Sequence, residues 1–336
     1  MSNEIEVIKN SGEDQTVDSL LRPTSWSEYV GQDKVKRNLK IILEAAKKRG
    51  EACDHLLFYG QAGLGKTTLA YLVARELGAN IKVTSGPALE KMGDLAAVLT
   101  NIEKNDILFI DEAHRINKTI EEVLYPAMEM RKLHLMVGKG PAARMITLDL
   151  PAFTLIAATT RADLLSGPLR SRFGASYKLD YYENPDIEAI VKRSADLLKI
   201  KVDSAAVKII AKASRFTPRV ANRLLKRVRD YAQVNSKEFV DGESAKQTLD
   251  LLEIDSLGLE PQDRQLLLAI IQKFKGGPVG ASTLAAALND ERGNIEEMYE
   301  PYLMSIGLLH RTPSGRVVTE AAYRHLGLNP PEGLLI

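Results

Sequence analysis

The sequence lacks the features that mark secreted, membrane-spanning or cysteine-rich metal-binding proteins. It has one cysteine, Cys53, among 336 residues, which excludes an internal disulfide and a metal site built from several cysteines. Its apolar runs are all much shorter than the roughly 20 residues that a membrane-spanning helix needs. The first twenty residues are too polar and acidic for a signal peptide. These absences predict a cytoplasmic protein.

The sequence also has no large excess of positive or negative charge, because 45 Lys and Arg residues balance 44 Asp and Glu residues. Composition therefore gives no general attraction to nucleic acid, and a polyanionic partner would have to be met by a local patch. The length allows two or three domains, each with its own core. Evidence for function must come from motifs.

The clearest motif is a glycine-rich loop at 60–68 (GQAGLGKTT), which follows an apolar run at 55–59 and precedes a helix-like segment at 68–77. This context fits the phosphate-binding pattern G-x-x-x-x-G-K-[ST] between a strand and a helix. The glycines let backbone N–H groups turn toward a phosphate, and the helix N-terminus adds partial positive charge. Lys66 can reach the outer phosphates of a nucleotide, and the Thr67 hydroxyl can bind Mg²⁺.

Strands and helices alternate around this loop. Strands are predicted at 55–59, 81–84, 106–110 and 153–158, the first and last of them buried, with helices between them. Such alternation is typical of a parallel, doubly wound α/β sheet, in which ligands bind beyond the carboxyl ends of the strands. The loop at 60–68, residues 111–114 and the strand tip at 159–161 should therefore surround one site.

Two carboxylates, Asp111 and Glu112, directly follow the third of these strands. An aspartate there can hold hydrated magnesium, and the glutamate can orient or deprotonate an attacking water. The alternative is an acidic pair that caps a helix N-terminus, which is the weaker interpretation beside a phosphate loop. His114 is better explained as a structural or signalling contact than as a base.

Three further features admit two interpretations each. The segment 21–32 either flanks the nucleotide or only packs on the core. Residues 131–149 have the alternation of an inserted β-hairpin, which either binds a partner protein or packs on its own domain. Arg170 and Arg172, in a loop bounded by a Gly-Pro pair and Gly174, either present charge to a phosphoryl group or are ordinary surface residues.

The remainder of the chain predicts two smaller domains. Residues 183–254 show only helical patterns, and Thr217-Pro218-Arg219 starts one of these helices, where Arg219 could reach a nucleotide. Residues 255–336 predict three helices and a short hairpin, the pattern of a winged helix, with a kink at Pro301. Arg311 and Arg316 flank the hairpin turn, where they either contact DNA phosphates or are simply solvated.

Taken in order, these motifs resemble those of AAA+ ATPases, and additional ones resemble the RuvB family of Holliday-junction branch-migration motors. The additional motifs are Leu21-Arg22-Pro23, 125–129 (YPAME), 140–144 (GPAAR), 299–303 (YEPYL) and 311–313 (RTP). The resemblance runs from about residue 20 to residue 330. Two departures stand out: Gln61-Ala62 replaces the usual two prolines, and Met130-Arg131 follows Glu129 where an acidic residue is more usual.

The resemblance implies an AAA+ P-loop domain with a parallel sheet over 1–182, a small helical lid over 183–254 and a winged helix over 255–336. It implies an ATP/ADP and Mg²⁺ site formed by Gly63, Gly65, Lys66, Thr67, Thr68 and Asp111, with Glu112 acting in hydrolysis and Thr160 sensing the γ-phosphate. Arg172 would enter the neighbouring subunit's site, and Arg219 would be the second sensor. Leu21, Arg22 and Tyr182 would line the adenine side, with Glu129, Met130 and Arg131 near the nucleotide.

The resemblance also implies a hexameric homo-oligomeric ring that moves double-stranded DNA at Holliday junctions during recombination and repair. The hairpin at 131–149 would bind RuvA, Arg311 and Arg316 would contact DNA, and the resolvase RuvC is a further partner of this family. One rival is a clamp-loader-like AAA+ protein that uses ATP as a switch on DNA. Another is a binding module with a dead site, which the intact Lys66, Asp111, Glu112 and Arg172 argue against.

Overall fold

The computed structural model describes residues 19–137 and 144–331. The chain forms two compact units. The first unit comprises the residues up to Asp186 together with Thr217–Arg219, and the second comprises Ile187–Phe216 and the chain from Val220 onward. None of the helices in these described ranges is long and apolar enough to cross a lipid bilayer.

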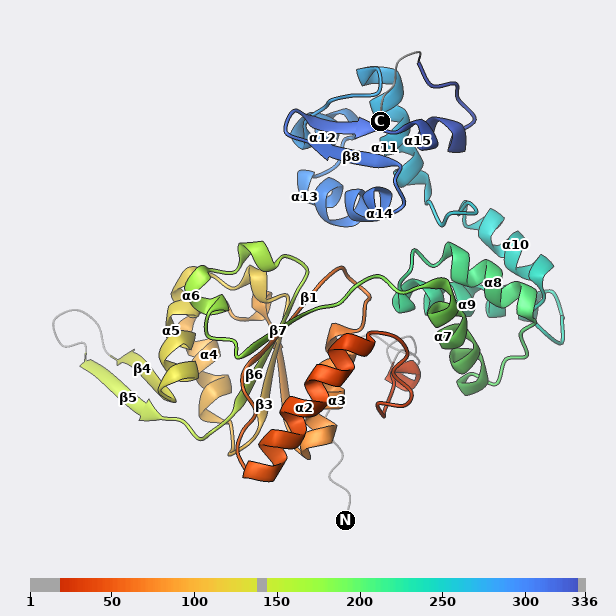
Figure 1. Ribbon diagram of the computed structural model, residues 1–336. Coiled ribbons are helices and arrows are strands. Elements are labelled where there is room, and N and C mark those ends of the chain that lie inside the picture. Colours follow the sequence, from red (N-terminus) through yellow and green to blue (C-terminus); the bar gives the residue numbers. More distant parts are fainter. Residues whose placement is uncertain (1–18, 138–143, 332–336) are drawn as a thin grey trace. The chain divides into compact units, whose positions relative to one another are not determined.

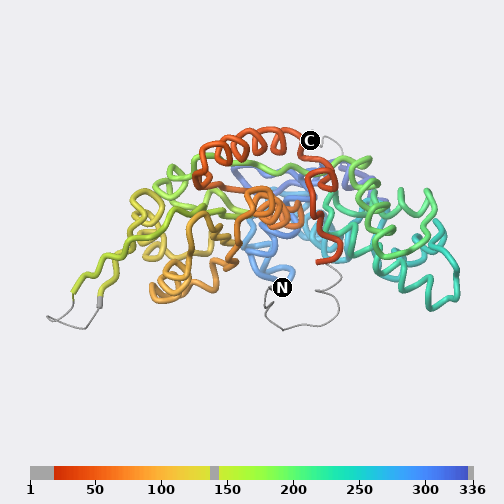
Figure 2. The backbone as a smooth tube through the Cα atoms, turned by 90° about the horizontal axis from the view of Figure 1, so that it is seen from below, coloured from red at the N-terminus to blue at the C-terminus, as the bar shows by residue number. Residues whose placement is uncertain are grey.

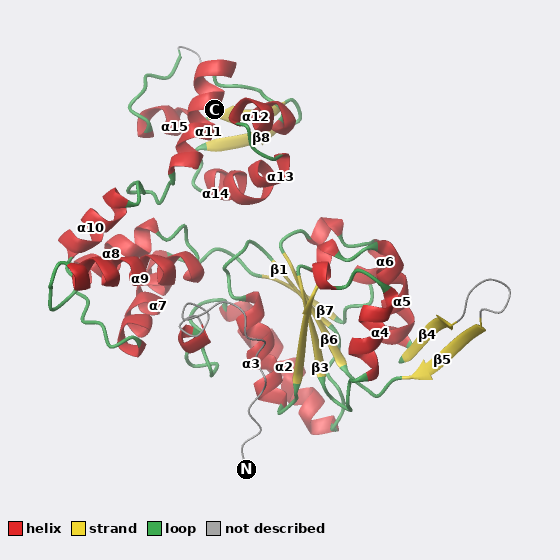
Figure 3. Ribbon diagram, turned by 180° about the vertical axis from the view of Figure 1, so that it is seen from behind, coloured by secondary structure: helices red, strands yellow, loops and turns green. Residues whose placement is uncertain are grey.

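The first unit is built on a five-stranded parallel sheet (Figure 1). Its strand order is β2 (Ile81–Ser85), β3 (Ile107–Asp111), β6 (Thr154–Thr159), β1 (Leu56–Tyr59) and β7 (Ala175–Lys178). One face carries α2 (Asp33–Arg49) and α3 (Lys66–Leu77), and the other carries α4 (Met92–Thr100) and α5 (Lys118–Glu129) (Figures 1 and 3). The prediction of a doubly wound α/β sheet is confirmed.

Apolar side chains between the sheet and its helices hold this unit together. Leu108 and Leu155 on the sheet pack with Leu95, Ile120 and their neighbours from α4 and α5. All six residues of β6 are buried, as a central strand covered on both faces requires. Because β1, β3 and β6 are adjacent and parallel, the loops that follow them open at the same edge of the sheet.

Strand β7 is absent from the sequence-based prediction. It pairs with β1 at the edge of the sheet, and Phe58 lies opposite Tyr177. Of its four residues only Tyr177 is buried, so the sequence shows no apolar run there. Pairing with a strand that lies more than a hundred residues earlier in the chain creates this strand.

The predicted hairpin is present as β4 (Lys132–Val137) and β5 (Arg144–Asp149), which pair antiparallel and extend away from the sheet (Figures 1 and 2). Leu133 near its base is buried, whereas Met136, Met145 and Ile146 are exposed. The turn expected at 138–141, and most of the 140–144 motif, lie outside the described residues. The hairpin therefore presents apolar side chains that its own domain leaves uncovered.

The second unit begins with the helical lid. Its helices are α7 (Asn184–Leu197), α8 (Ser204–Ala213), α9 (Pro218–Val234) and α10 (Gly242–Leu251). Pro218 is the first residue of α9, where a proline costs no hydrogen bond. Buried Leu224, Val228 and Leu225 give α9 its apolar face.

The winged helix follows the lid in the same unit. It contains α11 (Pro261–Phe274), α12 (Ala281–Leu288), α13 (Arg292–Asn294), α14 (Glu300–Ser305), the wing strands β8 (Leu309–Thr312) and β9 (Gly315–Val318), and α15 (Glu320–His325). The single third helix predicted here is divided, because a π-helical turn at Ile295–Tyr299 separates α13 from α14. Pro301 lies in the first turn of α14, where it lacks an N–H that the helix would not use.

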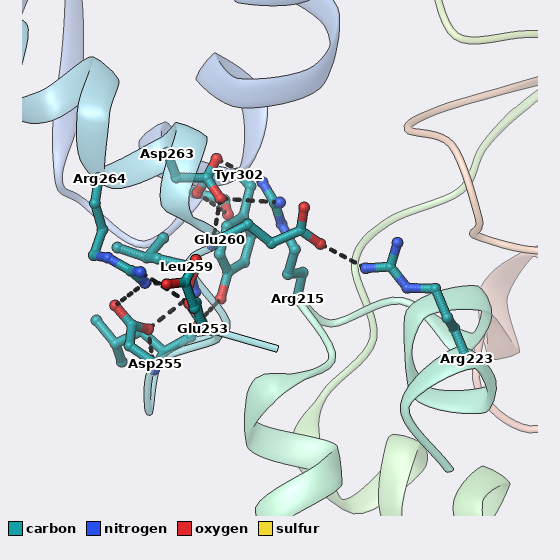
Figure 4. Close-up of polar contacts among 11 residues, drawn as sticks. Arg215, Arg223, Glu253, Asp255, Leu259, Glu260, Asp263, Arg264 and Tyr302 are labelled. Atoms are coloured by element: carbon teal, nitrogen blue, oxygen red, sulfur yellow. Dashed lines mark hydrogen bonds and ion pairs between the residues drawn. The ribbon is translucent and has the colours of Figure 1, made fainter. Parts of the chain in front are cut away.

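Ion pairs join the lid to the winged helix (Figure 4). Arg215 donates to both carboxylate oxygens of the buried Asp263 at 3.2 Å, and its guanidinium lies 4.5 Å from the centre of the Tyr302 ring. Arg223 pairs with Glu260 at 2.6 Å. Burial raises the pKa of Asp263 although Arg215 opposes the shift. The ion pair between Arg215 and the buried Asp263 therefore connects the start of α11 to the loop before α9.

Candidate nucleotide site

The loop between β1 and α3 has the backbone that the phosphate-binding pattern requires. Gly63 and Gly65 have φ values of +80° and +94°, a region that residues with a side chain rarely adopt. Leu64 between them is buried and anchors the loop. The N-terminus of α3 then follows at Lys66, so the free N–H groups of its first turn, including those of Thr67 and Thr68, point out of the helix.

Lys66 lies folded against this loop and is only 8% exposed. Its Nζ donates to the carbonyls of Gly60 at 2.7 Å and Gln61 at 2.8 Å. Burial lowers the Lys66 pKa to about 8, against the opposing effect of Asp111. These hydrogen bonds use backbone oxygens, which explains how Gln61-Ala62 can replace two prolines without loss of a Lys66 contact.

Thr67 and Asp111 meet across the site, because the Thr67 hydroxyl donates to Asp111 Oδ2 at 3.1 Å. The other oxygen, Oδ1, accepts from the Glu112 backbone at 2.9 Å. A hydroxyl and a carboxylate oxygen side by side are the hard ligands that Mg²⁺ takes alongside waters and phosphate oxygens. The chemistry of this pair fits a magnesium ion, and the magnesium site itself stays a prediction.

Glu112 occupies a left-handed conformation with φ of +48° at the end of β3, a costly geometry for a residue other than glycine or asparagine. Its side chain is half exposed and pairs with Arg115 at 2.9 Å. An exposed ion pair of this kind is weak. The carboxylate can therefore leave it for a water molecule in the site.

A hydrogen bond that the sequence did not predict links the tips of β3 and β6. The hydroxyl of buried Thr159 lies 3.0 Å from Nδ1 of His114 and accepts from the Arg161 backbone at 2.9 Å. Thr160 directly follows β6 and is partly exposed. Thr159 ends β6 directly after the apolar residues 155–158, and this polar end of the strand was the available signal.

The segment 21–32 packs against the phosphate loop. Tyr182 donates to the Leu64 carbonyl at 3.2 Å, and burial raises its pKa to about 12. A side chain added at Gly65 would lie 3.0 Å from the hydroxyl of the buried Tyr29, which the sequence had not singled out. Leu21 is buried, whereas Arg22 is exposed and its guanidinium lies 5.5 Å from the Tyr71 ring on α3.

Arg219 comes from the start of α9, yet it groups with the first unit. A Cβ atom added at Gly63 would lie 2.9 Å from the Arg219 Cβ. The side chain is exposed and starts beside the glycine loop. The sequence-based prediction that Arg219 can reach a nucleotide is thus compatible with the fold.

Arg172 lies just beyond α6 (Gly167–Arg170) and is held by its own subunit. Its Nη1 donates to the Pro168 carbonyl at 2.6 Å, and its Nη2 lies 3.2 Å from Glu129 Oε1. The guanidinium also lies 4.5 Å from the centre of the Tyr125 ring. Glu129, Met130 and Arg131 come from the end of α5, where Arg131 has φ of +54°. Glu129 therefore binds Arg172 rather than the phosphate loop.

The two wing arginines lie opposite each other on β8 and β9 but differ in their surroundings. Arg311 is exposed. Arg316 is buried, with Nε donating to Glu300 Oε1 at 2.6 Å and Nη2 donating to Glu296 Oε1 at 3.1 Å. The DNA contact expected of both arginines stays a prediction, and for Arg316 two carboxylates, from the π-helical turn and α14, balance the charge within the domain.

Known protein families match the whole of this arrangement. Residues 21–179 match the P-loop domain of the Holliday junction DNA helicase RuvB, residues 182–255 match the RuvB AAA lid domain, and residues 256–327 match the RuvB C-terminal winged helix domain.

Solved structures agree with these matches. The chain is 48% identical to the Thermotoga maritima RuvB Holliday junction branch migration motor, with 93% of this chain and 100% of that one covered and a TM-score of 0.86. A single-residue variant of the same protein is also 48% identical, with 93% and 99% covered and a TM-score of 0.85. The chain therefore belongs to the RuvB family of P-loop ATPases.

Proposed function

We propose that this chain is an ATP-hydrolysing motor that drives branch migration at Holliday junctions during recombinational DNA repair. The observation that carries the proposal is the group of Lys66, Thr67, Asp111 and Glu112 at one edge of the sheet. This group can bind a nucleoside triphosphate and activate water. We retain the boundaries 1–182, 183–254 and 255–336 for the motor domain, the lid and the winged helix.

Hydrolysis depends on positioning and on neutralising charge. Lys66 binds the outer phosphates, and the Glu112 carboxylate orients a water for attack on the γ-phosphorus and accepts its proton as the bond to the leaving oxygen breaks. Thr160 lies at the strand tip next to the γ-phosphate, and Arg219 meets the phosphates from the start of α9. Thr67 and Asp111 would hold Mg²⁺, which would supply positive charge to the phosphate oxygens.

The site is completed by a second copy of the chain. Arg172 of one subunit neutralises charge on the γ-phosphate of its neighbour, which makes hydrolysis depend on a ring, proposed here to be a hexamer. Leu21, Arg22 and Tyr182 line the adenine side. The buried Tyr182, which donates to the Leu64 carbonyl in the phosphate loop, supports this assignment.

The remaining parts connect ATP turnover to the junction. Exposed Met136, Met145 and Ile146 make the β4–β5 hairpin a docking surface for RuvA. Arg311 contacts backbone phosphates of double-stranded DNA from the wing, and Arg316 supports the wing from behind. RuvC is proposed as a further partner at the junction, and the cytoplasm as the place of action.

Dissociation of a synthetic four-way junction tests this function. The full chain with ATP, magnesium and RuvA should separate the junction into its arms, and omission of RuvA should reduce the rate. Lys66→Ala is the matched inactive control. A clamp-loader-like switch would hydrolyse ATP on DNA yet leave the junction intact, and that result would reject the motor. The hairpin and the winged helix favour the motor over this alternative.

A further inference from the structure

One face of α5 contacts the loop that carries Arg172. Glu121, Tyr125 and Glu129 are spaced four residues apart, so they lie in a row along the helix. Each of the three contacts the segment 166–172 or a residue bound to it. The stripe is separate from the phosphate loop of its own subunit.

The first half of this stripe fixes the start of α6. The Tyr125 hydroxyl lies 2.9 Å from Ser166 Oγ and donates to Glu121 Oε2 at 3.3 Å. Ser166 in turn caps α6 by accepting from the Leu169 backbone at 3.2 Å. Glu121 is buried, which makes this connection stable. Helix α5 thereby sets where α6 begins and where Arg172 emerges.

The second half of the stripe holds the guanidinium itself. The Tyr125 ring covers one face at 4.5 Å, Glu129 binds Nη2, and the Pro168 carbonyl binds Nη1. Within the part of the chain that the structure describes, Arg172 Nε is buried and lacks a hydrogen-bond partner. A buried donor left unpaired is unfavourable, so this conformation is maintained by the three contacts around it.

We infer that Tyr125 and Glu129 are positioning residues for Arg172, holding it in the conformation in which it enters the neighbouring subunit's site. The inference rests on the proposed function of Arg172. A free arginine loses much rotamer entropy when it binds, and an arginine that is already ordered avoids that loss. This role replaces the peripheral nucleotide contact that the sequence predicted for Glu129.

The accessibility of the two partners explains how Arg172 can be held and still react. The Arg172 side chain is 20% exposed, whereas that of Glu129 is 53% exposed. An ion pair so open to water is weak, and a phosphate oxygen can displace the carboxylate through a stronger charge-assisted hydrogen bond. The Tyr125 ring keeps the guanidinium in place during the exchange, because a cation–π contact leaves the N–H donors free.

Steady-state ATPase kinetics of assembled rings of the full chain test this role. Glu129→Gln and Tyr125→Leu should each lower kcat roughly tenfold, as expected for loss of one contact that orders a catalytic group. The KM for ATP should change less than about twofold, since a loss confined to the transition state leaves substrate binding intact. Tyr125→Phe keeps the ring but loses the hydroxyl contact with Ser166, so its kcat should lie between those of the parent and Tyr125→Leu.

Glu122→Gln is the control for loss of a carboxylate, because Glu122 is an exposed glutamate on the same helix, and it should match the parent. Glu129→Asp should restore part of the lost kcat. Melting temperatures identify any variant that fails to fold, and Tyr125→Phe and Glu129→Gln keep the inference testable if Tyr125→Leu is one of them.

Arg172→Ala separates this inference from the proposed function. Near-normal turnover by Arg172→Ala would reject the proposed trans arginine itself. An inactive Arg172→Ala with fully active Glu129→Gln and Tyr125→Leu would reject only the positioning role. A raised KM with unchanged kcat would show instead that Glu129 contacts nucleotide, and a raised kcat would show that it restrains Arg172. Either result overturns the inference.

Discussion

Lys66 in the phosphate loop and Arg316 in the winged helix are equally buried cations with opposite surroundings. Lys66 is 8% exposed and Arg316 is 7% exposed. Lys66 is bound by two neutral carbonyls, and burial lowers its pKa to about 8. Arg316 lies between the carboxylates of Glu296 and Glu300.

The difference shows how partners, rather than burial, decide what a buried charge does. A cation held only by carbonyl dipoles keeps its net charge, so an anionic ligand can gain from it. A cation that two carboxylates neutralise attracts a phosphate only weakly. Removal of that cation leaves a buried negative charge. The first arrangement suits ligand binding, and the second stabilises a domain.

The largest effect is expected for a change in the nucleotide site. Glu112→Gln keeps the shape of the side chain but removes the group that orients and deprotonates water, so turnover should fall by roughly 10²–10⁴. Affinity for ATP should remain, because Lys66 and the loop are unchanged. Phosphate release and nucleotide binding measured on the same preparation check both parts. Turnover like that of the parent would remove Glu112 from the mechanism.

Arg316→Ala should give the next largest effect. It tests whether the buried ion pairs of Arg316 stabilise the winged helix. Removal of one partner of a buried ion pair should lower the free energy of unfolding by about 3–5 kcal/mol, measured by denaturant titration. A second change, Glu300→Gln in the same chain, should recover part of the loss because it removes the stranded charge. Undiminished stability in Arg316→Ala, with DNA binding lost, would return Arg316 to the DNA surface.

The pH dependence of ATP binding tests the charge of Lys66. With a pKa of about 8 in the free protein, Lys66 is protonated at pH 7 and largely neutral at pH 9. The Kd for ATP should therefore rise about tenfold between these values. The free protein should become more stable between pH 8 and 10.5, because there the unfolded chain binds more protons than the folded one. A flat profile in Lys66→Arg is the control.

Arg311→Ala should give the smallest effect of these changes. It tests the exposed arginine of the wing. Loss of one phosphate contact should weaken binding to DNA of any sequence and reduce the slope of log K against log salt by about 0.9. Stability and ATP turnover without DNA should not change. An unaltered salt slope would exclude Arg311 from the DNA contact.

Several features were predictable because they depend on residues close together in the chain. The glycine loop at 60–68 needs only local backbone freedom and one lysine, and apolar runs mark three of the five sheet strands, β1, β3 and β6. The winged helix followed from helical spacing and a turn at 312–315. Family resemblance then predicted the roles of Arg172 and Arg219 from motif order, and these roles stay predictions.

Tertiary structure alone decided the pairings between distant residues. Strand β7 exists because β1 offers it an edge, and Thr159 meets His114 because β3 and β6 are neighbours. The sequence placed Arg316 beside a wing turn, and only the tertiary structure shows that it binds Glu300. Local patterns fix what each segment becomes, whereas the partner of each charge depends on which segments pack together.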